Sequence, residues 1–417
     1  TKEQIPSFNM SSRQNTRLIE TLVPPSIEGE KRNLFIRIIQ EWRKRLRSDD
    51  SKKPRVVFHS LERLDDKLSL AVIPLAASAG VMVPQISERS SSCKRRLADY
   101  FCVIFGAQTA LSLTHIRDQL FNEKAVVFSL PEPLKPFFRV RGSSGRMFSF
   151  CLGKMGLRER TGFLISFVYL CGADSVVFDM RVGQNSFIRT HQEGRALARC
   201  LKNACRRLGI RSCFFLRAED YFIGQCVGDS LETWEAVEVL RGRGPLDLRK
   251  MAIDIAAEMV WQARLPFHRA EIRKELKRKI VSGEALQKLK TIIAAQSGDP
   301  LLTEHSSCLS HPEARKSIVS EEEGFVHGLD ESRLVSIQAG LDMEKKTEYS
   351  GRSKGFVILK KRGDRIKRGS VLAEVYGDPI RDFSRLHRLF HELFVIKPDP
   401  PCFQPLIIEK IRDEELS

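Results

Sequence analysis

Residues 56–80 have the sequence VVFHSLERLDDKLSLAVIPLAASAG, in which a strand, a short loop and an apolar helix follow one another directly. The triplet VVF predicts a buried strand that turns at His59 and Ser60. Anions bind at such junctions in α/β proteins, because free backbone N–H groups and the helix dipole point at the loop. No glycine lies between His59 and Lys67, however, and the loop carries three carboxylates. The stretch therefore predicts an α/β unit whose anion-binding loop has been altered.

The same strand and helix pattern continues to about residue 240. Short apolar runs rich in Val, Ile and Phe alternate with helical segments, of which HQEGRALARCLKNACRRLG at residues 191–209 is the clearest. Strands separated by helices predict an α/β fold with a mainly parallel sheet. The expected strands are VVFHS, MVPQIS, KAVVFSL, DSVVFDM and RSCFFLRAE.

Composition shifts along the chain suggest five segments. A polar connector precedes residue 321, and from there the pattern changes to short strands and turns, which predicts a separate α+β domain. The expected segments are an extended basic arm at 1–27, the first part of a helical lobe with a linker at 28–55, an α/β domain at 56–300 that includes a second helical-lobe segment near 150–172, a linker at 301–320, and a C-terminal α+β domain at 321–417.

The 417 residues carry a net charge of +17, and 42% of them are hydrophobic. No apolar run approaches the ~18 residues of a membrane span, so no transmembrane segment is expected. A charge this high favours polyanionic partners such as nucleic acid. The ten cysteines form no CxxC pair, which favours reduced thiols in a cytosolic or matrix compartment. The first residues, rich in Ser, Asn, Gln and basic side chains, fit a mature end left after presequence removal.

Three separated motifs carry a family resemblance. The run GQCVGDSLETWEAVEVLRGRGPLDLRKMAIDIAAEMV at 224–260 resembles the closing helical region of the pyrimidine nucleoside phosphorylases, the thymidine phosphorylase family. DMRVGQNSFIRT at 179–190 and GFVILKKRGDRIKRGSVLAEVY at 355–376 are similar to further segments of that family, in the same order. The resemblance covers about residues 55–380. It implies a nucleoside-phosphorylase-like mainly parallel sheet domain, a helical lobe and a C-terminal α+β domain.

The resemblance also locates the two phosphate-binding segments of the family. In the first, whose family pattern is K-H-S-T-G-G-x-G-D-K-x-S-L, the three glycines become Glu62, Arg63 and Asp65. In the second, SERSSSCKRRLAD at 87–99, every family glycine is replaced. Backbone can approach phosphate closely only where no Cβ intervenes, so both losses predict weaker phosphate binding. The family's phosphate-site residues that remain are His59, Ser60, Asp66, Lys67, Ser69, Ser87 and Arg89.

The base-binding residues that the resemblance implies are altered as well. Arg139 or Arg141 is the candidate for the family's arginine, but its serine and lysine positions fall on Phe163 and Phe167. Because phosphate and base binding are affected independently, we expect a vestigial site and no catalysis. The competing hypothesis is a divergent active phosphorylase that uses Lys67, Ser87, Arg139 and Lys154.

The expected role is that of a structural subunit of a large ribonucleoprotein in the mitochondrial matrix, foremost the mitochondrial ribosome or its assembly intermediate. Its partners would be ribosomal RNA and neighbouring proteins, and the helical lobe would pair with a second copy or a related subunit. A scaffolding subunit of another mitochondrial complex is a further alternative. Basic side chains near the N-terminus and in the former phosphate segment are the RNA-binding candidates: Arg43, Lys44, Arg45, Lys52, Lys53, Lys94, Arg95 and Arg96.

A metal site has one weak signal. His387 and His391 are four residues apart on an expected helix, the spacing of a two-histidine metal pair. No glutamate stands where an HExxH motif has one, and no third ligand is evident in the sequence. We therefore expect a solvated helix face, with no metal and no cofactor.

Overall fold

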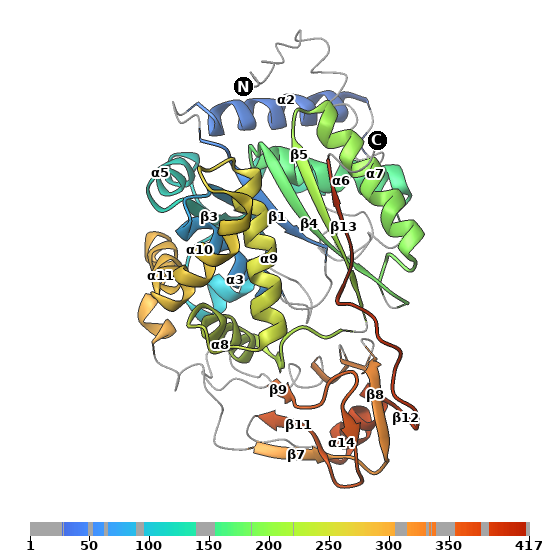
Figure 1. Ribbon diagram of the computed structural model, residues 1–417. Coiled ribbons are helices and arrows are strands. Elements are labelled where there is room, and N and C mark those ends of the chain that lie inside the picture. Colours follow the sequence, from blue (N-terminus) through green and yellow to red (C-terminus); the bar gives the residue numbers. More distant parts are fainter. Residues whose placement is uncertain are drawn as a thin grey trace.

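A parallel sheet forms the centre of the molecule (Figure 1). The computed structural model describes residues 27, 29–48, 53–61, 66–88, 96–138, 155–184, 186–219, 221–304, 315–330, 333–334, 336–338, 355–376 and 383–413. The main sheet has the order β1-β4-β5-β13, in which β1 (Val56–Ser60), β4 (Ser175–Val182) and β5 (Arg211–Ala218) are parallel. The predicted α/β fold with a mainly parallel sheet is confirmed.

A second pair of strands extends this arrangement. β2 (Val83–Ile86) and β3 (Ala125–Phe128) pair in parallel, and a bridge between Arg55 and Met82 joins β2 to the start of β1. All five strands expected from the sequence are therefore present. Strands buried on both faces need continuous apolar runs, and all the residues of β2, β3 and β4 are buried.

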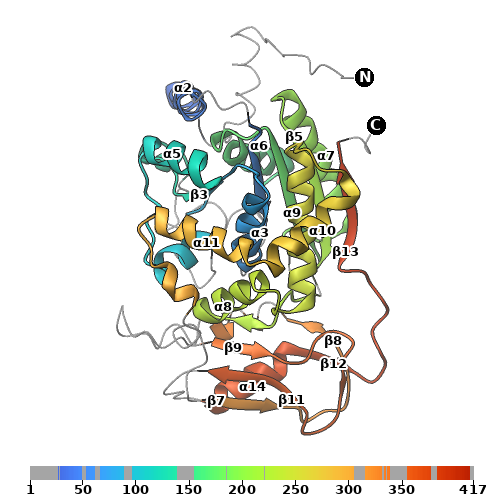
Figure 2. The same ribbon diagram turned by 60° about the vertical axis from the view of Figure 1, so that its left-hand side comes forward.

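Helices bury their apolar surfaces against one face of the sheet. α3 (Lys67–Ser78) is buried along almost its whole length, and it lies between α9 (Leu246–Gln262) and α11 (Glu284–Ala295) in Figure 2. α9 also packs on β1 and β4, so the 224–260 run lies beside the sheet as the family resemblance implies. A helix that is apolar all round belongs in a protein interior, which explains the LSLAVIPLAA sequence of α3.

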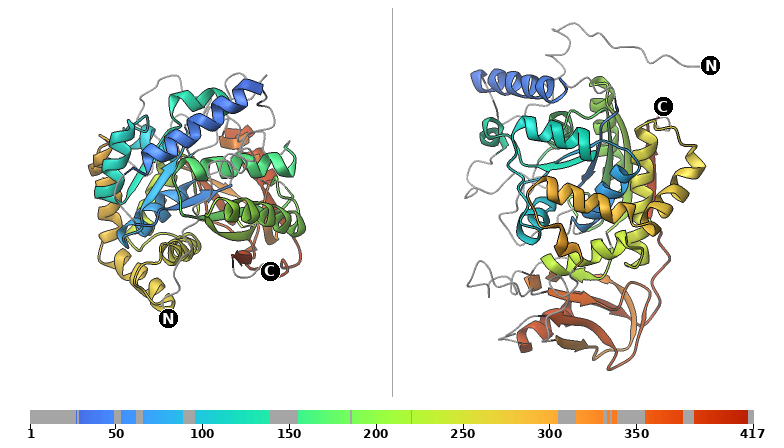
Figure 3. Two further views of the ribbon diagram at one scale, coloured as in Figure 1. Left: turned by 90° about the horizontal axis from the view of Figure 1, so that it is seen from above. Right: turned by 90° about the vertical axis from the view of Figure 1, so that its left-hand side faces the viewer.

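α2 (Gly29–Leu46) lies across one end of the molecule, where it packs against α5 (Leu113–Glu123) and α6 (Leu157–Leu170) (Figure 3). The Trp42 indole donates a hydrogen bond to the carbonyl of Leu170 at 3.0 Å. The helices α2 and α6 thus lie side by side. Among the described helices, none has the length and apolar character needed to cross a membrane.

The C-terminal region contains two small antiparallel sheets, with orders β6-β9-β11-β7 and β10-β8-β12. β6 (Cys226–Val227) precedes α8 in the main domain and pairs with β9 (Gly355–Ile358), so the first of these sheets is shared between the two regions. β13 (Ile407–Arg412) returns to the main sheet and pairs antiparallel with β5. The segment expected as a C-terminal domain at 321–417 therefore also contributes an edge strand, β13, to the main sheet.

The remaining elements connect these parts: α4 (Leu97–Asp99), η2 (Tyr100–Ile104), η3 (Glu132–Phe138), α7 (His191–Arg207), α8 (Asp229–Leu240), α10 (Arg269–Val281), η6 (Pro300–Thr303), β7 (Arg315–Val319), β8 (Gly324–Leu329), β10 (Arg365–Ile366), β11 (Val371–Tyr376), α14 (Phe383–Leu393) and β12 (Phe394–Lys397).

Candidate active site

Charged and polar side chains gather at the carboxyl ends of β1, β4 and β5. The strand register places Ser60 beside Asp179 and Arg181 beside Arg217. The carboxyl ends of parallel strands meet at one edge of a sheet, and open α/β sheets bind ligands in the crevice outside that edge. The next helix in the chain, α3, begins there with Lys67. This edge is therefore the candidate active site.

Lys67 is anchored in the protein interior. Its side chain is 2% exposed, and its Nζ lies 2.7 Å from Oε2 of Glu235. The same Nζ donates to the carbonyl of Cys226 at 2.8 Å and lies 4.6 Å from the ring centroid of Phe222. A buried ammonium group is stable only when paired and hydrogen-bonded, and both conditions are met here.

The segment 224–235 explains how Lys67 is held. Oε1 of Glu235 accepts hydrogen bonds from the backbone N–H groups of Gln225 at 2.6 Å and Cys226 at 3.2 Å. Gly224 has φ of +75°, and a Cβ there would lie 2.3 Å from Oε2 of Glu235 and 2.8 Å from Nζ of Lys67. The glycine is required both by its backbone conformation and by the ion pair packed against it. The motif that carries the family resemblance is thus the support of the site lysine.

A second buried ion pair lies beside it. Arg217 donates from Nε and Nη2 to the two carboxylate oxygens of Asp179, at 2.7 and 2.9 Å, and both side chains are almost fully buried. Burial raises the pKa of Asp179, but the two-point pairing with the guanidinium favours its charged form. Arg181 donates from Nη2 to the carbonyl of Glu219 at 3.0 Å.

These groups line a small cavity. Lys67, Arg181 and Arg217 contribute three positive charges to its wall, and Tyr221 and Phe222 contribute aromatic surface. Its internal volume is about 10 Å³, which is room for about one water molecule. The carboxylates of Glu235 and Asp179 pair with Lys67 and Arg217, and the charge of Arg181 also acts on Asp179. Buried carboxylates therefore hold the cations of the cavity wall in place.

His59 lies at the same edge as a neutral imidazole. Its ring is 5.8 Å from the ring centroid of Phe178 and 6.2 Å from that of Phe167. Burial, with a smaller contribution from the charge of Arg96, lowers the pKa of His59 to about 4. At neutral pH the imidazole therefore adds no charge.

The other retained residues join the two phosphate segments to each other. The Ser69 hydroxyl donates to Oδ1 of Asp66, and Oδ2 of Asp66 accepts from the backbone N–H of Leu97 at 3.3 Å. The Ser87 hydroxyl accepts from the backbone N–H of Ala98 at 3.0 Å. Asp66 and Ser87 thus both hold the start of α4. Asp66, Ser69 and Ser87 are thus connected near the start of α4, while His59 and Ser60 end β1 and Lys67 begins α3.

Other predicted site positions lie outside the described residues. These are Arg89, Arg139 and Lys154, together with the substituted loop positions Glu62, Arg63 and Asp65.

Some of the RNA-binding candidates lie among the described residues and others do not. Arg43 is used inside the helical lobe, where it donates to the carbonyls of Tyr169 at 2.8 Å and Ala173 at 3.1 Å. Arg96 is half-buried and lies near His59, so neither arginine is a free surface cation. Lys44, Arg45 and Lys53 are exposed, whereas Lys52, Lys94 and Arg95 lie outside the described residues.

Sequence reasoning missed four residues of the site: Asp179, Arg181, Arg217 and Glu235. Three of them stand inside motifs that carry the family resemblance, at 179–190 and 224–260. Arg217 had a weaker signal, as a single charge near the end of the apolar strand RSCFFLRA. A charged residue in a fully buried strand indicates a buried partner, which the structure identifies as Asp179.

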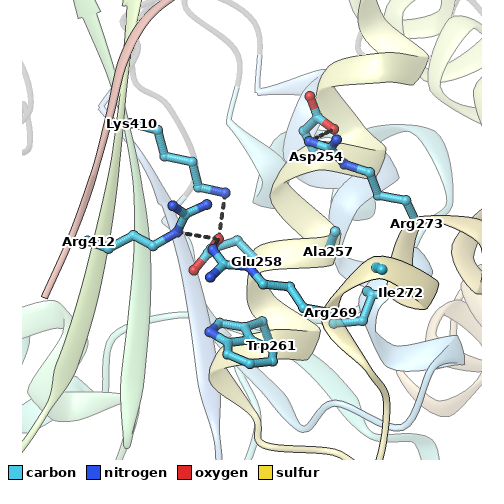
Figure 4. A pocket seen from close by; sticks show the side chains of 10 residues that line it. Asp254, Ala257, Glu258, Trp261, Arg269, Ile272, Arg273, Lys410 and Arg412 are labelled. Carbon is cyan, nitrogen blue, oxygen red and sulfur yellow. Dashed lines mark hydrogen bonds and ion pairs between the residues drawn. The ribbon is translucent and has the colours of Figure 1, made fainter. Parts of the chain in front are cut away.

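A larger cavity lies away from this edge, between α9, α10 and β13 (Figure 4). Its volume is about 230 Å³. Lys410 and Arg412 reach from β13 toward the buried carboxylate of Glu258, at 2.5 and 3.3 Å, and Arg269 approaches from α10. None of the site residues predicted from the sequence lines it. We therefore place the chemistry at the carboxyl edge of the sheet despite the smaller volume there.

The site lies outside the carboxyl ends of parallel strands, the place where open α/β sheets bind their ligands. No family model matches the chain. The chain is 25% identical over 359 residues to the pyrimidine-nucleoside phosphorylase of Geobacillus stearothermophilus, covering 85% of this chain and 81% of that protein. It is 26% identical over 342 residues to the pyrimidine-nucleoside phosphorylase of Staphylococcus aureus, covering 79% of this chain and 76% of that protein. The chain is a relative of the pyrimidine-nucleoside phosphorylases, and the recognition made from its motifs is confirmed.

The expectation of a non-catalytic protein is contradicted by the same comparison. The relatives that match most of the chain are named as phosphorylases, and none of the comparisons indicates a loss of activity in this chain. Replacement of loop glycines was therefore too weak a basis for inferring an inactive site.

Among solved structures, an anthranilate phosphoribosyltransferase from Thermus thermophilus aligns with 69% of this chain and 96% of its own, with 14% identity and a TM-score of 0.46.

Proposed function

We propose that this protein is a divergent pyrimidine-nucleoside phosphorylase. In that reaction phosphate attacks the anomeric carbon of a pyrimidine nucleoside, the bond from that carbon to the base nitrogen breaks, and the products are the free base and a sugar 1-phosphate. The similarity to two phosphorylases over more than three quarters of their length supports this proposal. The observation that carries it is the buried Lys67 at the carboxyl edge of the sheet, with Arg181 and Arg217 beside it.

The described residues have distinct roles in this proposal. Lys67 and Arg181 attract the phosphate dianion, and the N-terminus of α3 adds its dipole. The side chain of Ser60 lies at the same strand end, where it hydrogen-bonds Asp179. His59, which is neutral at neutral pH because burial lowers its pKa to about 4, donates a hydrogen bond from its ring N–H to a phosphate oxygen.

Substrate binding requires the crevice to open. A cavity of about 10 Å³ holds about one water molecule, whereas a nucleoside and a phosphate need several hundred Å³. The crevice is bounded by the sheet edge on one side and by β6, α8 and the C-terminal strands on the other.

An assay of the purified protein tests the proposal. Incubation with uridine or thymidine should release the free base only when inorganic phosphate is present, with an equal amount of sugar 1-phosphate. The phosphate dependence separates phosphorolysis from hydrolysis by a contaminating nucleosidase. Absence of phosphate-dependent release with both nucleosides would overturn the proposal.

We also propose, on charge, that the protein associates with RNA in the mitochondrial matrix, where ribosomal RNA is the expected partner. The net charge of +17 and the exposed Lys44, Arg45 and Lys53 support this. Co-sedimentation of the tagged protein with ribosomal particles, lost after ribonuclease treatment, is the expected result. Migration as a small free dimer, unchanged by ribonuclease, would contradict it.

A further inference from the structure

The C-terminal region contains two histidines on one face of α14. His387 and His391 are one helical turn apart, and their ring centroids are 4.6 Å from each other. Residues at positions i and i+4 of a helix are surface neighbours, so the imidazoles point to the same side. Two imidazoles in this arrangement are a common half of a metal site.

The fold supplies a third ligand that the sequence did not reveal. Glu321 follows β7, and its Oε1 lies 3.8 Å from Nε2 of His391. One ligand atom from each of Glu321, His387 and His391 lies within 4.8 Å of the other two. The expectation that these histidines have no third partner was therefore wrong, because the partner comes from a distant part of the chain.

His391 also has an unsatisfied polar atom. Its Nε2 is shielded from solvent and has no hydrogen-bond partner in the described structure. An unpaired buried nitrogen costs free energy that a hydrogen bond or a metal bond recovers. Of the three side chains, Glu321 is the most accessible, with 68% of its side chain exposed, so a metal ion has a route from solvent.

We propose that Glu321, His387 and His391 form a binding site for a divalent transition-metal ion, with Zn²⁺ as the preferred occupant. Two imidazoles and one carboxylate are a recognised zinc ligand set, whose fourth position is held by water. Calcium and magnesium select oxygen ligands and do not suit this set. Zinc bonds of ~2.1 Å in a tetrahedral site place neighbouring ligand atoms ~3.4 Å apart. The 3.8 Å between Nε2 of His391 and Oε1 of Glu321 needs only a small closing movement.

A metal at this position would link two elements of the C-terminal region. Glu321 lies between β7 and β8, which belong to different small sheets, while both histidines lie on α14. An ion that binds only the folded arrangement stabilises it by mass action. The proposal is independent of the phosphorylase function, because the described residues of the candidate active site contribute no ligand.

Metal titration of the full chain, purified with chelator, tests this proposal. Zn²⁺ should bind with one equivalent of high affinity and raise the thermal unfolding midpoint. Co²⁺ used as a probe should give d–d absorption without a thiolate-to-cobalt charge-transfer band, which excludes binding by the ten cysteines. The affinity should fall by at least ~10-fold in His391→Ala and in Glu321→Gln, since each removes a direct ligand.

His327→Ala is the matched control, because His327 lies in the same region and its Nε2 hydrogen-bonds the carbonyl of Asp399 at 2.8 Å instead. Its zinc affinity should equal that of the unchanged protein. Circular dichroism of the metal-free variants checks that they are folded, and the exposed position of Glu321 makes Glu321→Gln the safer variant in this respect. Absence of the zinc equivalent, an affinity unchanged in Glu321→Gln, or a thiolate band in the cobalt spectrum would each overturn the proposal.

Discussion

The residues that hold Lys67 and the loop that precedes it in the chain differ in how closely they match the family's sequence pattern. Behind the lysine, Gly224, Glu235 and the β6–α8 segment keep the family's pattern and bury its ammonium group. In the preceding loop, residues 61–66, bulky and charged residues stand where the family's pattern has glycines. In this chain a buried ion pair and backbone hydrogen bonds hold Lys67, so its position does not depend on the sequence of the loop that precedes it. Whether the site is active therefore has to be judged from the buried cations, because the sequence of the loop does not reveal them.

The largest effect on stability is expected from Arg217→Met. The substitution leaves Asp179 buried without its two-point partner, which costs about 3–5 kcal/mol of unfolding free energy. The double variant Asp179→Leu/Arg217→Met should recover most of that loss, because an apolar pair needs no charge compensation. Urea unfolding measures both variants. Equal stability of the single and double variants would show that the pair is not the cause.

Gly224→Ala should have the next largest effect. The new Cβ would meet the Lys67–Glu235 pair and would require a side chain at φ of +75°. We expect a loss of about 3 kcal/mol, from backbone strain and displacement of the pair. Gly209→Ala is the control, since its φ is +68° but nothing lies within 4 Å of the added Cβ, so only about 1–2 kcal/mol should be lost. Similar losses in both variants would contradict the tight packing at Gly224.

The buried His59 imidazole should make the stability of the folded protein depend on pH. Its pKa in the folded protein is lowered to about 4, below the value near 6.5 of the unfolded chain. The unfolded state then binds more protons between these two pH values, so stability falls as the pH drops from about 6.5 toward 4. His59→Phe should flatten this part of the stability profile, whereas His327→Phe should leave it unchanged. An unchanged slope in His59→Phe would mean that another group titrates there.

The smallest effect is expected at the exposed end of α2. Lys44→Gln should change unfolding free energy by less than about 0.5 kcal/mol, because the side chain is exposed. If the surface contacts RNA phosphates, the same change should reduce the slope of log affinity against log salt by about 1. Filter binding at several salt concentrations measures that slope, and a slope identical to that of the unchanged protein would remove Lys44 from the RNA contact.

The sequence predicted the five parallel strands well, because apolar runs are local signals. It did not predict the Lys67–Glu235 pair, whose partners are far apart in the chain and meet only through α3 and α8. The return of β13 to the main sheet was missed for the same reason, since IIEKIR gives no indication of its partner β5. Glu321 was missed as a ligand because nothing in its neighbourhood marks it. The sequence alone therefore did not predict which side chains and strands pair when they are far apart in the chain.

The most direct test of the central claim compares Lys67→Met with Lys44→Met in the phosphorolysis assay. Lys67 supplies the buried positive charge at the proposed phosphate position, whereas Lys44 is an exposed lysine on α2. At a temperature where both variants remain folded, we predict that Lys67→Met loses about 10²-fold or more of the phosphate-dependent rate. Lys44→Met should keep the full rate. Equal rates in the two variants would contradict the account.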